Sequence, residues 1–98
     1  NTRMYLMREQ LSPEQTVPGI IELLHDYSIT AQDIAMECNL DLDNVHDALS
    51  IFAFDSCPLF VIASVRCAFH HLLAERGWKG DKKKIWGKHD IRILFTGC

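Results

Sequence analysis

The sequence lacks an apolar stretch long enough to cross a membrane, because charged residues or proline interrupt every long hydrophobic run. It also lacks a G-x-S-x-G motif and a glycine-rich phosphate loop after a strand, and no carboxylate pair falls in a predictable cleft. The sequence therefore does not support a membrane protein or an enzyme of the classes that use these motifs. We expect a protein that is not an enzyme, with no catalytic residues, no cofactor and no membrane partner.

Cysteine is sparse and follows no pattern. The four cysteines, Cys38, Cys57, Cys67 and Cys98, include no C-x-x-C pair and are too few for a disulfide scaffold. We therefore expect reduced thiols in a cytoplasmic protein. Cys67 and His71 would share a helix face if this region is helical, but a closed zinc site needs more ligands than two. No metal is expected.

Basic residues are nearly missing from the first part of the chain. Residues 1–58 contain two basic and ten acidic residues, whereas residues 59–98 contain eight basic and three acidic residues. The overall net charge of −3 hides this division. The basic end could bind nucleic acid, or the opposite charges could simply face each other within the fold.

The most informative pattern that is present lies at residues 29–50 and predicts a helix-turn-helix. Thr30 is a candidate N-cap, and Asp33 would complete a capping box with it. Asn39 stands where the turn needs a left-handed residue, and Asp41 would cap the second helix. The apolar positions expected in the core are Ile34, Ala35, Cys38, Leu40, Val45, Ala48, Leu49 and Phe52.

Helical patterns surround this motif within a single domain, residues 1–98. The 48% of apolar residues is sufficient for a core. An N-terminal arm would precede three helices. We place the arm at residues 1–11 and the helices at about 18–27, 31–38 and 42–54.

The C-terminal part, residues 59–98, predicts a wing. Residues 60–67 are rich in β-branched side chains and favour a strand. A helix capped by Ser64 and stopped by Gly77 is the alternative, so residues 68–76 stay open. A glycine-rich basic loop at 77–88 and an alternating strand at 89–95 would follow. The expected fold class is α+β, a winged helix-turn-helix in which three helices precede a β-hairpin wing.

The order T-x-x-D-I-A-x-x-x-N-L-x-x-x-x-V-x-x-A-L resembles the helix-turn-helix of bacterial transcription regulators, with Asn39 in place of the usual glycine. More narrowly, residues 29–96 resemble the CaiF/GrlA family of transcription activators. The segments that carry this resemblance are ITAQDIA, NLDLDNVHDALSIF, FVIASVRC and HDIRILF. The resemblance implies a sequence-specific activator that binds double-stranded DNA.

Candidate DNA contacts lie in the helix-turn-helix and in the basic wing at 77–92. Asparagine can read adenine, aspartate can accept from cytosine, and lysines in a wing would contact phosphates. The alternative for the wing is a solvated loop whose tryptophans, Trp78 and Trp86, pack on the core. The candidate residues are Thr30, Gln32, Asp43, Asn44, His46, Lys79, Lys82, Lys83, Lys84, Lys88 and Arg92.

One feature opposes DNA binding. Asp41, Asp43 and Asp47 lie on the exposed face of the predicted recognition helix, where carboxylates would face phosphates. Two functions therefore remain open. The first is a DNA-binding transcription regulator that uses helix 42–54 and the wing. The second is a protein-interaction module, or adaptor, whose acidic helix docks on a basic partner such as a regulatory protein. A homodimer is compatible with both functions.

Overall fold

A computed structural model describes residues 11–89 of the chain. The N-terminal arm expected at residues 1–11 and the strand expected at 89–95 thus lie almost entirely outside the described residues. Five α-helices and two short 3₁₀ helices occur within 11–89. They are α2 (Ile20–Asp26), α3 (Ala31–Cys38), α4 (Leu42–Ala48), α5 (Ala53–Ser56), α6 (Leu59–Glu75), η1 (Lys82–Lys84) and η2 (Gly87–His89).

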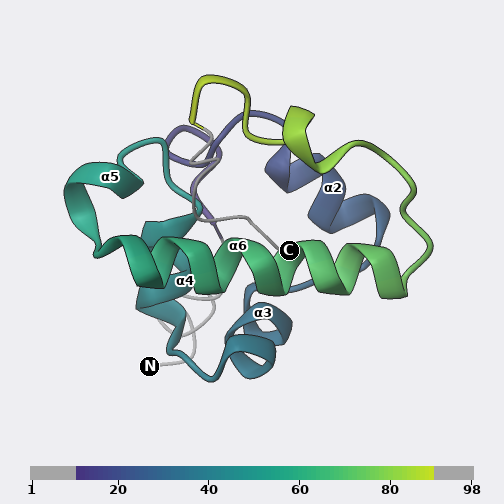
Figure 1. Cartoon of the computed structure of the whole chain (residues 1–98), viewed down its shortest axis with the longest axis horizontal. Coiled ribbons are helices and arrows are strands. Elements are labelled where there is room, and N and C mark those ends of the chain that lie inside the picture. Colours follow the sequence, from purple (N-terminus) through teal and green to yellow (C-terminus); the bar gives the residue numbers. More distant parts are fainter. Residues whose placement is uncertain (1–10, 90–98) are drawn as a thin grey trace.

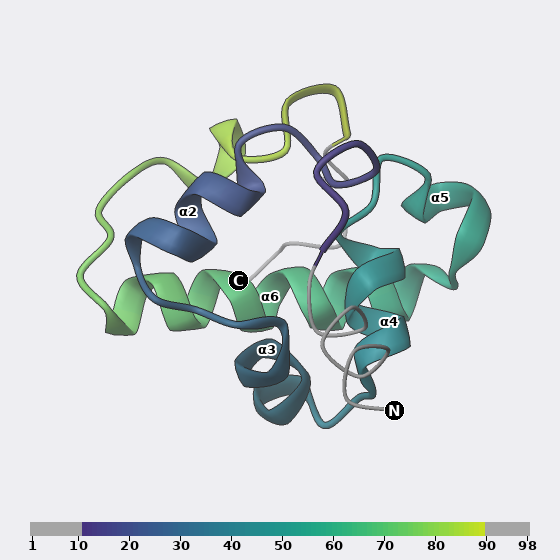
Figure 2. The same ribbon diagram turned by 180° about the vertical axis from the view of Figure 1, so that it is seen from behind.

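The longest helix, α6, forms the centre of the fold, and the other helices surround it (Figure 1). The helices α3 and α4 pack against α6 and against each other. Figure 2 shows α3 on one side of α6, and α2 together with residues 77–89 on the other side. The helix α5 lies at one end of the molecule, beside the start of α6 (Figure 1).

The expectation of a winged helix is wrong, because residues 11–89 contain no β-strand and so no β-hairpin wing. The strand expected at 60–67 lies inside α6, which also includes residues 68–75 of the segment left open at 68–76. The reason is the composition of its first turns. The buried positions of α6 follow a helical period, but the positions between them also hold apolar residues, such as the exposed Phe60 and the partly buried Ala63 and Cys67. Residues 60–67 are therefore a nearly continuous apolar run, rich in β-branched residues, that resembles a buried strand. Its buried apolar residues are Val61, Ile62, Val65, Ala68, Phe69, Leu72 and Leu73.

The ends of α6 follow from local sequence. The helix begins after Pro58, earlier than a cap at Ser64 would allow. The helix ends at Glu75, and Gly77, the stop given for the helical alternative, follows it with a φ of 93°. The N–H of Trp78 then donates to the Leu73 carbonyl at 2.9 Å, which satisfies a carbonyl in the last turn of the helix.

The helix expected at 42–54 is two helices, because the backbone between them pairs with residues 15–17. The N–H of Val17 donates to the Leu49 carbonyl at 3.0 Å, and the N–H of Ile51 donates to the Gln15 carbonyl at 2.7 Å. These long-range hydrogen bonds replace those that would continue α4. As a result Phe52, expected in the core, is 51% exposed.

The local structure of the helix-turn-helix is as expected. Thr30 Oγ1 accepts from the N–H of Asp33, and Asp33 Oδ2 accepts from the N–H of Thr30, both at 3.0 Å. Asn39 has the left-handed conformation, with φ 58°, at the end of α3. Asp41 Oδ1 accepts from the N–H of Asn44 at 2.9 Å. These caps set the directions in which α3 and α4 leave the turn.

The apolar side chains of this motif form the core with α2 and α6. Ile34, Val45 and Leu49 are fully buried, whereas Leu40 is partly buried and packs against the core. The position of α4 on α6 is therefore fixed by packing, and only its polar face reaches the surface.

The cysteines are not all thiols. Cys67 is disulfide-bonded, whereas Cys38 and Cys57 are free. The expectation of reduced thiols is therefore wrong for Cys67, and cysteine chemistry no longer argues for a cytoplasmic location. Within residues 11–89, no helix has the length and apolar character that a membrane span requires.

Candidate functional site

The exposed face of the helix-turn-helix is acidic. Asp41, Asp43 and Asp47 are exposed on or next to α4, and Asn44 is half-buried between them. Among residues 11–89, no salt bridge involves any of these three carboxylates. Their charges therefore face solvent and are available to a partner.

No cation within the motif offsets these charges. The sequence contains no Lys or Arg between Arg8 and Arg66, so α3, the turn and α4 have none. The affinity of proteins for DNA depends mainly on cations that displace the counterions of the phosphates. The surface of α4 thus has the wrong charge for a duplex and a favourable charge for a basic protein segment.

His46, expected to read bases, is only partly accessible to solvent. It is half-buried, and its Nε2 is buried with no hydrogen-bond partner among the described residues. The ring lines a cleft with Asp47, Ser50 and Phe52. His46 therefore belongs to the packing of the α4–α5 junction, since a buried ring nitrogen cannot reach a base edge.

The two candidates on α3 differ in their roles. Both Thr30 and Gln32 are exposed at the start of the helix. The hydroxyl of Thr30 is already engaged in the capping box, whereas Gln32 is available to a partner. Of the sequence-predicted residues on α3 and α4, Gln32, Asp43 and Asn44 keep side chains at the surface.

The five lysines of residues 77–89 are exposed on a segment that packs against α6. Trp86, which is 1% exposed, anchors this segment to the core. Asp81 shapes it locally, because Asp81 Oδ1 accepts from the N–H of Lys83 at 3.0 Å. The lysines are Lys79, Lys82, Lys83, Lys84 and Lys88. Arg92, the last candidate contact, lies outside the described residues.

The structure does not bring the lysines and the helix-turn-helix to one face. Residues 77–89 pass on the side of α6 opposite to α3 and the start of α4 (Figure 1). A duplex bound along α4 would therefore not meet the lysines as it would meet a wing. The two groups of candidate DNA contacts form separate surfaces.

A buried arginine, one of the eight basic residues of 59–98, connects these elements. Arg66 is fully buried on α6, with its guanidinium carbon 4.2 Å from the ring centre of Trp86. Its Nε donates to the Ala48 carbonyl at 3.1 Å, and its Nη1 donates to the His89 carbonyl. Arg66 thus ties the end of α4 to the lysine segment. The sequence hints at this burial, because Arg66 stands inside an apolar run.

An exposed apolar cluster lies next to the acidic helix. Phe52, Phe54, Leu59 and Phe60 are 51%, 43%, 51% and 68% exposed. They belong to α5, its flanks and the start of α6, which share one end of the molecule (Figure 1). Large side chains exposed together, with acidic residues beside them, are typical of surfaces that bind proteins.

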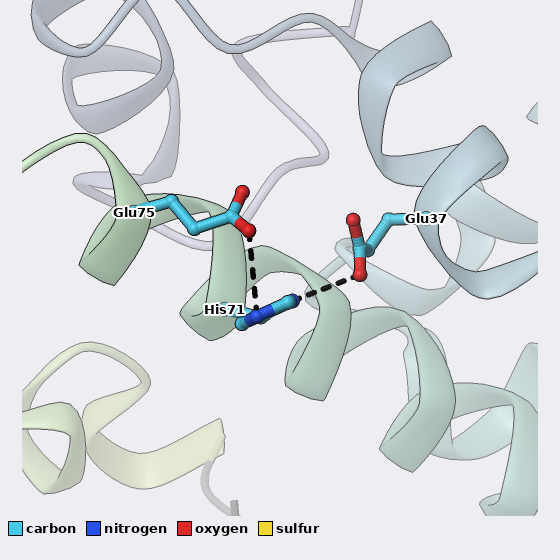
Figure 3. Close-up of side chains that lie close together, drawn as sticks. All are labelled: Glu37, His71 and Glu75. Carbon is cyan, nitrogen blue, oxygen red and sulfur yellow. Dashed lines mark hydrogen bonds and ion pairs between the residues drawn. The ribbon is translucent and has the colours of Figure 1, made fainter.

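A second polar cluster, also missed, joins α3 to α6 (Figure 3). His71 Nδ1 lies 2.8 Å from Glu37 Oε2, and His71 Nε2 lies 3.5 Å from Glu75 Oε1. The hydrogen bond to Glu37 and the charges of Glu75 and Glu37 raise the pKa of His71 above its ordinary value of 6.5. The sequence does indicate the pair of His71 and Glu75, because residues four apart on a helix lie side by side. Glu37 comes from 34 residues away, so no local pattern could add it.

Comparison of this chain with models of known families, with curated proteins and with solved structures finds no match.

Proposed function

We propose that this chain is a protein-interaction domain of the helix-turn-helix type, which docks a basic segment of a partner against α4. The observation that carries the proposal is the group of exposed carboxylates Asp41, Asp43 and Asp47, which form no salt bridge with residues 11–89, on a motif with no Lys or Arg. Opposite charges steer a partner to such a face and fix how it docks.

The exposed apolar cluster beside α4 supports the same function. Phe60 and Phe52 are large enough to supply the buried anchors that dominate binding energy, and Asp47 and Asp55 lie near them in sequence. A basic amphipathic helix fits this combination, because it offers an apolar face and cations at the edges.

The test uses the full chain and two probes, a synthetic amphipathic helix of lysine and leucine and a random duplex DNA. We expect the peptide to bind and a glutamate–leucine counterpart not to bind. Phe60→Ala should cost about 1 kcal/mol or more of peptide binding. Asp43→Asn with Asp47→Asn should weaken binding more at low salt than at high salt.

A matched control is the triple variant Lys82→Ala, Lys83→Ala, Lys84→Ala, which should bind the peptide like the wild type. The proposal is wrong if the peptide does not bind the wild type. It is also wrong if the peptide binds both Phe60→Ala and the double variant Asp43→Asn, Asp47→Asn as tightly as the wild type.

DNA binding is the second candidate, and the exposed lysines of residues 77–89 favour it. In that case the wild type binds the random duplex with a steep decrease of affinity with salt. The triple lysine variant would then lose about one unit of that slope for each phosphate contact removed. Since α4 is acidic and lies away from the lysines, such binding would be independent of sequence.

A further inference from the structure

We propose that Glu37, His71 and Glu75 form a surface site for a divalent transition-metal ion, with Zn²⁺ as the ion that fits its ligands, between α3 and α6 (Figure 3). This site is separate from the surface of α4 and does not depend on the proposed function.

The ligand atoms are close enough to share one ion. One nitrogen of His71 and one oxygen of each glutamate lie within 4.8 Å of one another. Figure 3 shows both carboxylates pointing towards the imidazole ring, one from each helix. Because Glu37 and Glu75 face different nitrogens of the ring, at least one of these exposed side chains must rotate before all three ligate one ion with bonds of about 2.0–2.2 Å.

The backbone that holds the ligands is firmly placed. His71 and Glu75 are one turn apart on α6, and their neighbours Leu72 and Leu73 are buried in the core. Glu37 lies in the last turn of α3, whose first turn is fixed by the capping box. A salt bridge of 3.6 Å between Arg76 and Asp33 joins the same two helices. The three ligands therefore stand on packed helices, which is the support a metal site requires.

The ligand types select the ion. Imidazole suits Zn²⁺ and its neighbours in the first transition row, and carboxylates are compatible with these ions. Three protein ligands leave a position for water, as in exchangeable zinc sites and unlike closed structural ones. Beside Glu37 and His71 lies an open hollow where water can complete the coordination; it is also lined by Cys38, Ser64, Ala68 and the disulfide-bonded Cys67.

A proton competes with the ion for this cluster. Without an ion, the ring of His71 lies between two carboxylates, and an ion binds only the unprotonated nitrogen of an imidazole. The other ionisable groups near His71 are Cys38 of α3, His70 of α6, and Lys79 and Lys82 across a second hollow. We therefore expect Zn²⁺ affinity to fall as pH decreases through the range in which His71 becomes protonated.

Calorimetric titration of the full chain with zinc chloride tests the proposal. We expect one ion per chain and an increase in melting temperature, since the ion joins two helices of the folded state. We expect weaker zinc binding, by about tenfold or more, in each of the variants His71→Ala, Glu37→Gln and Glu75→Gln. Loss of a residue that only orients a metal ligand already lowers affinity about tenfold, and loss of a ligand should cost at least as much. Circular dichroism checks that each variant is folded.

Two controls separate this site from other zinc ligands. His25→Ala removes an exposed histidine whose Nδ1 lies 3.7 Å from Asp26 Oδ1. This variant should bind zinc with the affinity of the wild type. Burial raises the pKa of the Cys38 and Cys57 thiols, so the double variant Cys38→Ser, Cys57→Ser should also bind normally. Cobalt bound in place of zinc should give a spectrum without a sulfur charge-transfer band.

The proposal is overturned if the wild type binds no zinc at millimolar concentration, or if His71→Ala binds as tightly as the wild type. It is also overturned if the serine double variant loses the ion, because the thiols would then be the ligands.

Discussion

The indole N–H of Trp86 donates a hydrogen bond of 2.9 Å to Nε2 of His70 on α6, and both side chains are buried. The indole ring also meets the edge of Phe69, with ring centres 6.0 Å apart. The lysine segment, residues 77–89, is therefore a packed layer of the fold whose lysines face outward.

Removal of Trp86 should destabilise the whole domain. We expect Trp86→Ala to lower the free energy of unfolding by about 3–5 kcal/mol, because it leaves a large cavity beside Phe69. Trp86→Phe should cost about 1–3 kcal/mol, because His70 loses the indole donor while most of the packing stays. Urea unfolding measures both. The exposed Lys84→Ala is the control and should change stability by less than about 0.5 kcal/mol.

A second prediction concerns the buried guanidinium of Arg66. Lysine keeps the positive charge but cannot donate to the Ala48 and His89 carbonyls in a fixed fork or stack on Trp86. We expect Arg66→Lys to destabilise the domain by about 1–3 kcal/mol in urea unfolding. Arg76→Lys, at a partly exposed salt bridge to Asp33, is the matched control and should have little effect. Equal stability of the two variants would contradict the role assigned to Arg66.

The parts of the fold that could be predicted are those set by neighbouring residues. The capping box of Thr30 and Asp33, the left-handed Asn39 and the cap at Asp41 are all present as expected. Each depends on hydrogen bonds or backbone conformations within a few residues, so the sequence pattern contains the needed information.

The parts that were missed depend on contacts between distant segments. α4 ends early because Leu49 and Ile51 pair with residues 15–17. α6 was mistaken for a strand because apolar residues outside its buried face, such as the exposed Phe60, hide the helical period, and only the packing of α3 and α4 shows which side is buried. The charges of the candidate DNA contacts were evident, but their separation by α6, and the inward position of His46, depend on the tertiary fold.

The two exposed aspartates at the start of α4 should differ in their effect on stability. Asp41→Ala removes the cap on the N–H of Asn44 and should cost about 1 kcal/mol. Asp43→Ala removes a similar charge in the first turn but no cap, and should cost less than about 0.5 kcal/mol. Asp41→Asn keeps an acceptor and should restore most of the loss. Thermal unfolding of the three variants measures these differences. Equal melting temperatures for Asp41→Ala and Asp43→Ala would contradict the role of Asp41 as the N-cap of α4.

The last prediction is a pH dependence that originates at His71. Its pKa is raised above 6.5 in the folded state, first by the hydrogen bond to Glu37 and then by the charge of Glu75. The protonated ring therefore favours folding. This contribution is fully present below the unfolded-state pKa of about 6.5 and is lost as pH rises through the folded-state pKa. His89 acts in the opposite direction, since burial, Lys88 and Arg66 lower its pKa.

Because these two histidines oppose each other, the effect of His71 is measured as a difference between variants. NMR titration without added metal should give His71 a pKa above 6.5, and Glu37→Gln should lower it because the carboxylate that accepts from Nδ1 is gone. The urea midpoint of Glu37→Gln should fall below that of the wild type at about pH 5–6 and approach it at about pH 8. Asp26→Asn, beside the exposed His25, is the control and should leave the His71 titration unchanged. A His71 pKa at or below 6.5 in the wild type would show that Glu37 does not hold the protonated ring, and α3 and α6 would then lack this ion pair.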